Sequence, residues 1–155
     1  MFLQGQKIVN LGKPFMIKLG NHMSDMIRDE TMTNGVDVLG KKFKPLSPRY
    51  ASRKAAGKFR RQSEVSNRAN LVLTGDMMQD LQPRRATRSK VWIGWTASES
   101  GKIIGNADRG RAVTLKSKPV SDNVLASAMG RMNRQIALNI KKHASGKKLT
   151  IKMGK

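Results

Sequence analysis

The most regular pattern in this sequence lies between residues 121 and 143, where apolar side chains recur at steps of three and four residues. That spacing places them on one face of an α-helix, and Ser121 or Asp122 is suited to cap its first turn. The apolar face consists of Leu125, Ala128, Met129, Met132, Ile136 and Ile140, and the other face carries Arg131, Arg134, Lys141 and Lys142. The sequence therefore predicts an amphipathic helix over residues 121–143.

A second amphipathic helix is predicted over residues 14–34. Pro14 suits its first turn, where a missing N–H is not needed, and Thr33-Asn34-Gly35 is typical of a helix end. Gly20 weakens the helix by about 1 kcal/mol relative to Ala. His22 lies off the apolar stripe and has no second His or carboxylate at ligand spacing, so we expect no metal site there. The stripe is formed by Phe15, Met16, Leu19, Met23, Met26 and Ile27.

A β-strand is predicted near residue 92. Val91, Ile93 and Trp95 alternate with Lys90, Trp92 and Gly94, and this period of two is typical of a strand. We expect a hairpin loop at 105–110 and a returning strand at 112–116. The apolar run 70–73 fits either a strand or a helix. Thr74, the next residue in the chain, is suited to cap a brief helix whose side chains Met77, Met78 and Leu81 face the core.

Together these elements predict an α+β fold in which a small antiparallel sheet packs with a long N-terminal and a long C-terminal helix. A length of 155 residues fits one domain, residues 1–155, with a modest core. The expected segments are an N-terminal arm at 1–13, a helix at 14–34, a long basic loop at 38–66, a short helix and antiparallel strands at 70–118, a helix at 121–143 and a basic tail at 145–155.

The loop at 38–66 concentrates positive charge. Its first 26 residues contain nine cations and no acidic residue. The cations are Lys41, Lys42, Lys44, Arg49, Arg53, Lys54, Lys58, Arg60 and Arg61. Apolar anchors are spaced among them, at Phe43, Leu46, Tyr50 and Phe59. Residues 50–59 fit either a short helix or an extended chain. The loop is either a solvated insertion or, as we favour, an arm that docks on a neighbouring subunit with its charge toward DNA.

The whole chain is strongly basic, with 31 Lys and Arg against 10 Asp and Glu and a net charge of +21. Such an excess favours a polyanionic partner, nucleic acid first among them. The tail contributes Lys147, Lys148, Lys152 and Lys155, and the apolar residues alternating with them allow a strand that pairs with a neighbour.

Catalytic chemistry is not expected. The chain has no Cys, two distant His and ten scattered acids, which provide no nucleophilic triad, no paired acid and base and no metal cluster. We therefore predict that the protein is not an enzyme and needs no cofactor. A run of 18 apolar residues and a cleavable leader are both missing from the sequence, which predicts a soluble protein made in a cytoplasm.

Several short motifs occur in a characteristic order. They are Gly40-x-x-Phe43-x-Pro45-Leu46-Ser47-x-x-Tyr50, then Arg53-Lys54, then Leu71-x-Leu73-Thr74-Gly75-x-Met77-x-x-x-Leu81, then Val91-x-Ile93-Gly94. This order resembles the virion morphogenesis proteins of tailed bacteriophages, which complete the tail or join it to the head. The resemblance covers roughly residues 15–140 and includes a turn motif at Leu73, Thr74, Gly75 and Asp76. The chain departs from it at residues 95–101, where the family has an aromatic-Ala pair followed by His-Gln-Gly.

The resemblance implies a structural virion protein that forms a homo-oligomeric ring in the neck. We favour a sixfold ring, as in a tail terminator, over a twelvefold one, as in a head-side connector. Its partners would be neighbouring neck, connector or tail-tube proteins, with the host cytoplasm as the place of assembly. The ring would line a channel and contact genomic DNA without reading its sequence, and the charge independently suggests this. Two alternatives remain: a small free nucleic-acid-binding protein of ribosomal or nucleoid type, and an adaptor for an acidic protein.

Overall fold

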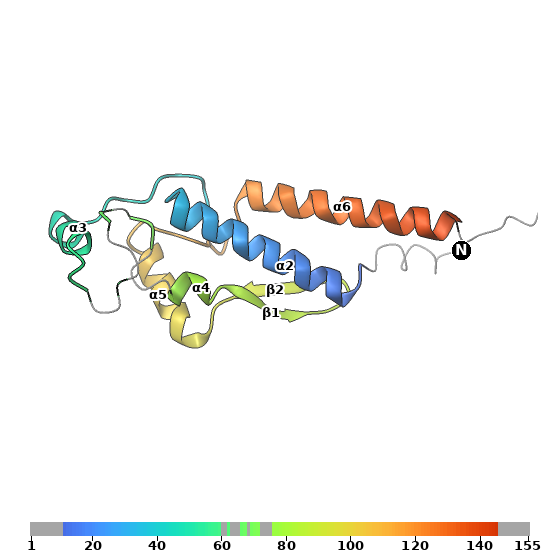
Figure 1. Ribbon diagram of the computed structural model, residues 1–155, viewed down its shortest axis with the longest axis horizontal. Coiled ribbons are helices and arrows are strands. Elements are labelled where there is room, and N and C mark those ends of the chain that lie inside the picture. Colours follow the sequence, from blue (N-terminus) through green and yellow to red (C-terminus); the bar gives the residue numbers. More distant parts are fainter. Residues whose placement is uncertain (1–10, 60–61, 63–65, 68, 72–75, 146–155) are drawn as a thin grey trace, which may run out of the picture.

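The computed structural model of the protein describes residues 11–59, 62, 66–67, 69–71 and 76–145. Its elements are α2 (Lys13–Arg28), a π-helical turn η1 (Asp29–Thr33), α3 (Pro48–Ala55), α4 (Asp76–Gln79), β1 (Gln82–Ala86), β2 (Val91–Gly94), α5 (Ala97–Ala107) and α6 (Asp122–Ser145). A two-stranded antiparallel sheet with long helices near both ends confirms the predicted α+β class. The helix α2 lies between the hairpin and α6 (Figure 1).

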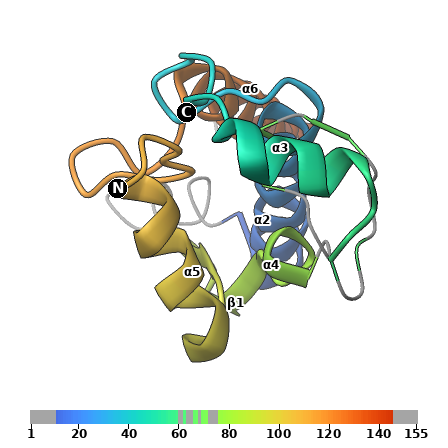
Figure 2. The same cartoon turned by 90° about the vertical axis from the view of Figure 1, so that its left-hand side faces the viewer.

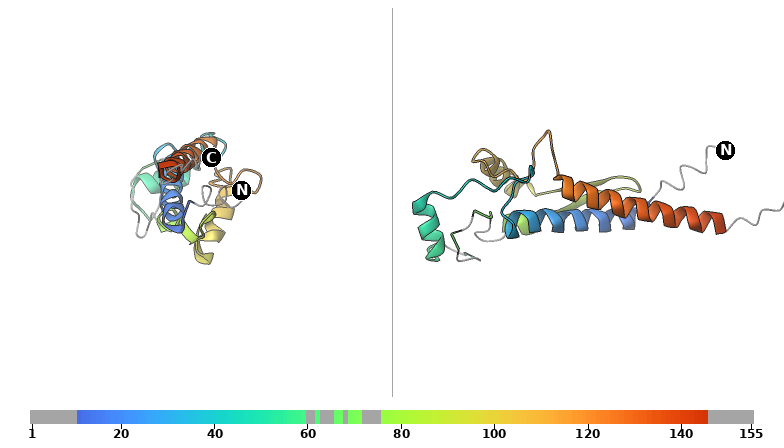
Figure 3. Two further views of the ribbon diagram at one scale, coloured as in Figure 1. Left: turned by 90° about the vertical axis from the view of Figure 1, so that its right-hand side faces the viewer. Right: turned by 90° about the horizontal axis from the view of Figure 1, so that it is seen from above.

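The two long helices match their predicted spans closely. The first continues from α2 into η1 and ends before Gly35, which adopts a φ of +59°. The second, α6, lies beside α2 and extends beyond it, as Figure 3 shows from above. Of the predicted apolar face of α6, Ala128 is buried, together with Val124, which was not predicted. Leu125, Met129 and Ile140 of that face are exposed, because α2 covers only one edge of it.

A polar contact also joins these helices, because His22 Nε2 lies 2.8 Å from Ser127 Oγ. His22 is therefore placed at the boundary of the helix pair. Burial lowers the pKa of His22 below its usual 6.5, and the nearby cation Arg131 lowers that pKa further.

The sheet is antiparallel, but the strand that pairs with β2 precedes it in the chain, whereas the prediction placed that strand after it. The strand β2 was expected, but its partner is β1, with Gln82 opposite Gly94 and Ala86 opposite Val91. A bulge at residue 84 interrupts the register between Pro83 and Arg85. Pattern analysis missed β1 because its residues, Gln-Pro-Arg-Arg-Ala, lack apolar alternation.

The predicted loop at 105–110 and returning strand at 112–116 are wrong. The helix α5 (Ala97–Ala107) runs into the predicted loop, residues 108–110 form a turn after it, and residues 111–121 have no regular structure. Ala112 and Val113 are buried all the same, and the Ala112 carbonyl accepts a hydrogen bond from Val38 N at 3.0 Å. The glycines in this span suggested turns, whereas Thr96-x-x-Glu99 is a sequence pattern typical of a helix start.

The core consists of two clusters that meet on α2. One joins α2, α4, α5 and α6 through Ile27, Met77, Met78, Leu81, Ile103, Val113 and Val124, and the other contains Leu11, Met16, Leu19 and Ala128. Met77, Met78 and Leu81 are buried as predicted. Both clusters are small, which fits the low apolar content of the chain.

The hairpin approaches α2 closely at Gly20. A Cβ atom on this residue would lie 2.7 Å from Val91 Cγ2 and 2.8 Å from Pro83 Cγ. Both distances are below normal van der Waals contact, so the hairpin can pack in this position only against a residue without a side chain. The helix-weakening glycine thus has a packing role.

We expect Gly20→Ala to destabilise the protein although Ala favours helices, because the added methyl overpacks the α2–hairpin contact at a cost of about 1–3 kcal/mol. The matched control is Gly130→Ala in α6, where a Cβ atom meets nothing within 4 Å and the free energy of unfolding should rise by up to about 1 kcal/mol. Urea denaturation measures both. Equal effects of the two substitutions would contradict the proposed packing role.

A carboxylate connects the hairpin to the helices on either side of it. Asp80 Oδ2 accepts hydrogen bonds from Thr96 N at 2.6 Å and Thr96 Oγ1 at 2.9 Å, just before α5. Its Oδ1 pairs with Arg84 at the bulge, 2.6 Å away. The Thr96 N–H, and next the Arg84 side chain, lower the pKa of Asp80 below its usual 3.8.

Because the folded-state pKa of Asp80 is lowered, its stabilising contribution is complete above pH 3.8 and is lost as pH falls through the folded-state value. We expect Asp80→Asn to lower the melting temperature at neutral pH, with the difference from wild type shrinking in acid below 3.8. Melting curves across this range test it, with Asp122→Asn as a control because that exposed carboxylate pairs with Lys118 on the surface. A constant difference at every pH would refute this role for the Asp80 charge.

Candidate nucleic-acid interface

The first part of the predicted basic loop is folded against its own chain. An isolated bridge pairs Val36 with Lys42, and Asp37 Oδ1 accepts hydrogen bonds from the N–H groups of Leu39 and Lys41, at 2.9 and 2.8 Å. Phe43, one of the predicted anchors, is buried, and its N–H bonds to the Gly35 carbonyl. This anchor therefore holds the loop to the body of the protein itself.

The second part contains a helix. Of the two alternatives for residues 50–59, the helical one is found over the first half, in α3. Pro48 stands in its first turn, and Gly57, with a φ of +65°, follows its end. The helix lies at one end of the molecule, apart from α2, α6 and the hairpin (Figures 1 and 2). We call residues 44–59 the α3 arm.

Two of the other predicted anchors contact each other within the α3 arm. The ring centroids of Tyr50 and Phe59 lie 4.9 Å apart, and the Arg53 guanidinium lies 4.8 Å from the Phe59 centroid. Aromatic and cation–π contacts of this kind order exposed side chains. Leu46, the fourth anchor, is half-buried. The Tyr50–Phe59 pair thus gives Arg53 a defined position on the surface of the arm.

Lys54 corrects the predicted set of DNA-facing cations. Its side chain is only 2% exposed, and its Nζ donates a hydrogen bond to Asn70 Oδ1 at 2.8 Å. Asn70 Nδ2 in turn donates to the Met32 carbonyl at 3.3 Å, at the end of the first helix. A buried ammonium needs such partners. Lys54 therefore attaches the arm to the body and does not face a polyanion.

Arg111 attaches the arm at its other side. Its Nε and Nη2 atoms donate to the carbonyls of Lys44 and Pro45, each at 3.1 Å. The sequence offered no signal for this role, because Arg111 is one cation among many and lies 66 residues from Pro45.

The remaining predicted cations divide into two groups. Lys41, Lys42, Lys44, Arg49, Arg53 and Lys58 are exposed, and of these Lys42 also donates to the Asn34 carbonyl at 2.7 Å. The second group lies outside the described residues and consists of Arg60, Arg61 and the tail residues Lys147, Lys148, Lys152 and Lys155. Also outside them are the motif residues Leu73, Thr74 and Gly75 and most of the N-terminal arm. The motif residue Asp76 begins α4.

A second basic surface, which sequence analysis missed, lies on the hairpin. Arg85 stands over the Trp92 ring, 5.1 Å from its centroid, and Trp92 is 44% exposed. Arg88 and Lys90 are exposed at the hairpin turn. The signal was available, because residues 84–90 hold four cations and no acid. The exposed cations of α6 (Arg131, Arg134, Lys141 and Lys142) form a third basic surface.

Few of the cations in the described ranges have an ion-pair partner there. Across the described ranges the ion pairs are Arg28–Asp25, Arg84–Asp80, Lys102–Glu99 and Lys118–Asp122. Arg49, Arg53 and Lys58 of the arm take part in none of them. Exposed cations of this kind bind phosphates without reading sequence. The part of the chain that the structure describes holds no group of three His, Cys, Asp or Glu able to bind a metal ion.

No helix in the described ranges is both long and apolar enough to cross a membrane.

No protein-family model matches this sequence, and comparisons with curated proteins and with solved structures found no significant match.

Proposed function

We propose that the protein is a structural component of a tailed-phage virion that forms a homo-oligomeric ring in the neck, completes the tail or joins it to the head, and lines the DNA channel. The motif order described above supports the family. The observation that carries the DNA contact is the α3 arm, whose cations Arg49, Arg53 and Lys58 are exposed and join no ion pair among the described residues.

The arm suits such a contact because it is exposed yet held at its base. Lys54 and Arg111 connect it to the body through hydrogen bonds, so its cations keep a defined place relative to the rest of the subunit. Phosphate contacts release counterions and are insensitive to base sequence. A genome could therefore slide past a ring of such arms, and the role requires no chemical step.

We expect the combined change of Arg49, Arg53 and Lys58 to Gln to weaken binding to duplex DNA and to reduce the dependence of affinity on salt. Each lost phosphate contact makes the negative slope of log K against log salt shallower by about 0.9. The matched control replaces Lys13, Lys18 and Lys116 with Gln, because these cations are also exposed, lie outside the arm and join no ion pair in the described ranges. Titrations at several salt concentrations measure both. Equal losses would show that the arm is not the DNA contact.

The charge also governs assembly. Each copy carries +21, and the repulsion between copies is only partly screened over the Debye length of about 8 Å in physiological salt. We expect few rings at low salt, and more at moderate salt, with DNA or with an acidic neighbouring ring. Electron microscopy would show sixfold rings for a tail terminator and twelvefold rings for a connector. Equally stable rings at low and high salt without a polyanion would contradict this.

One observation favours the alternative of a free nucleic-acid-binding protein. Basic surfaces on the hairpin and α6 lie away from the α3 arm (Figure 1), so polyanion contact need not be limited to one side. Gene order separates the two functions: portal and tail genes beside this gene support the neck protein, and translation or chromosome genes support the free protein.

A further inference from the structure

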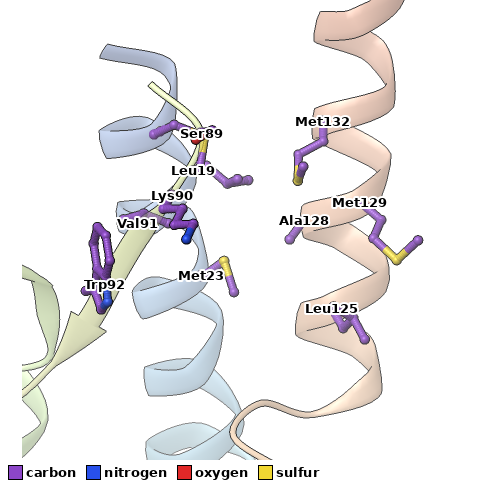
Figure 4. A pocket seen from close by; sticks show the side chains of 11 residues that line it. Leu19, Met23, Ser89, Lys90, Val91, Trp92, Leu125, Ala128, Met129 and Met132 are labelled. Atoms are coloured by element: carbon purple, nitrogen blue, oxygen red, sulfur yellow. The ribbon is translucent and has the colours of Figure 1, made fainter. Parts of the chain in front are cut away.

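An apolar groove with a volume of about 440 Å³ lies between α6 and β2, with α2 beneath it (Figure 4). Four of its lining residues are methionines, Met16 and Met23 from α2 and Met129 and Met132 from α6. Methionine side chains are flexible and polarizable, which suits a surface that accepts another apolar side chain.

The groove is open to solvent. Met129 is 54% exposed, and Trp92 on the opposite wall is exposed as well. Lys90 lies on the β2 side of the opening (Figure 4) and joins no ion pair within the described ranges. A contiguous exposed apolar surface with a polar rim is typical of an interaction site.

The complementary feature lies on α5. Ile104 is 64% exposed, more than any other large hydrophobic residue among those described. Asp108 is exposed and lies four residues further along the chain, a spacing that places it on the same helix face as Ile104. This carboxylate also joins no ion pair in the described part of the chain. The α5 surface thus combines a protruding apolar side chain with a negative charge.

Charge decides which surfaces of two copies can meet. In a chain of net charge +21, α5 holds one acid and one cation, Glu99 and Lys102, which pair at 2.8 Å. A neutral helix can approach another copy without the repulsion that the α3 arm or the basic face of α6 would meet. Asp108, the residue directly after α5, has the sign that Lys90 at the groove requires. The neighbouring cation Arg109 bends back onto α5, where its Nη1 donates to the Gly105 carbonyl at 2.7 Å.

We propose that the groove between α6 and β2 receives α5 of a second copy of this chain, with Ile104 among the methionines and Asp108 beside Lys90. The contact joins two different surfaces and is therefore heterologous, so that its repetition produces a ring or a filament. As an account of the ring it rests on the proposed function, whereas the contact itself does not.

The test is sedimentation velocity of the full chain, in the salt that gives the most assembly, with and without short duplex DNA. We expect wild type to assemble and Met129→Glu or Ile104→Glu to weaken self-association by about tenfold or more, because each places a carboxylate in an apolar contact. Leu39→Glu is the control, since Leu39 is 46% exposed in a loop outside both surfaces. Circular dichroism and melting curves check that each variant is folded.

Mixing the two variants gives a sharper result. Each supplies one intact surface, so an equal mixture should form dimers and nothing larger. Lys90→Glu and Asp108→Lys should each weaken assembly, and the two changes in one chain should restore it. The proposal is overturned by variants that assemble as wild type does, by a mixture that forms large assemblies, or by a wild type that stays monomeric in every condition, which would assign the groove to residues 1–10 or to another protein.

Failure of the proposed function would be seen separately. If wild type assembles through this contact but is missing from purified phage particles, the neck function is refuted and the contact remains.

Discussion

The close approach of the β-hairpin to α2 is the constraint on which the rest of this structure depends. It needs the absent side chain at Gly20, and it places Val91 and Pro83 directly on the helix. The helix can then serve both core clusters, with the hairpin on one side and α6 on another (Figure 3). In a chain with few apolar residues, one helix that contacts both neighbours is an economical way to form a core.

Polar contacts hold the hairpin and the α3 arm in place where the small core has few apolar contacts with them. Asp80 joins the end of α4, the bulge of β1 and the start of α5 through one carboxylate. Lys54 and Arg111 do the same for the α3 arm, using Asn70 and backbone carbonyls as acceptors. Charged donors and acceptors make the stronger hydrogen bonds in proteins. Residues that resemble surface charge in the sequence therefore determine how the arm and the hairpin are held.

The distribution of charge separates two kinds of surface. The α3 arm, the hairpin turn and one face of α6 present exposed cations, which suit phosphate contacts. The groove with its methionines and the neutral helix α5 present apolar side chains instead. In the proposed ring, the first kind would meet DNA and the second would meet neighbouring copies. In that ring, the division would keep the repulsion between basic surfaces away from the contacts between copies.

The sequence by itself determined the α+β class, both long helices, the strand β2 and the inward direction of Met77, Met78 and Leu81, because these follow from local apolar periodicity. The tertiary structure alone decided the partner of β2 and the inward turn of Lys54. For the helical state of residues 97–107 the sequence held only the short Thr96-x-x-Glu99 pattern, and the structure decided it. The strand β1 is defined by pairing and by its contact with Gly20, and α5 starts at a threonine bound by the distant Asp80. Unlike its exposed basic neighbours, Lys54 is buried and donates to Asn70. Contacts between residues far apart in the chain leave no periodic signal, and for that reason the fold was needed to identify them.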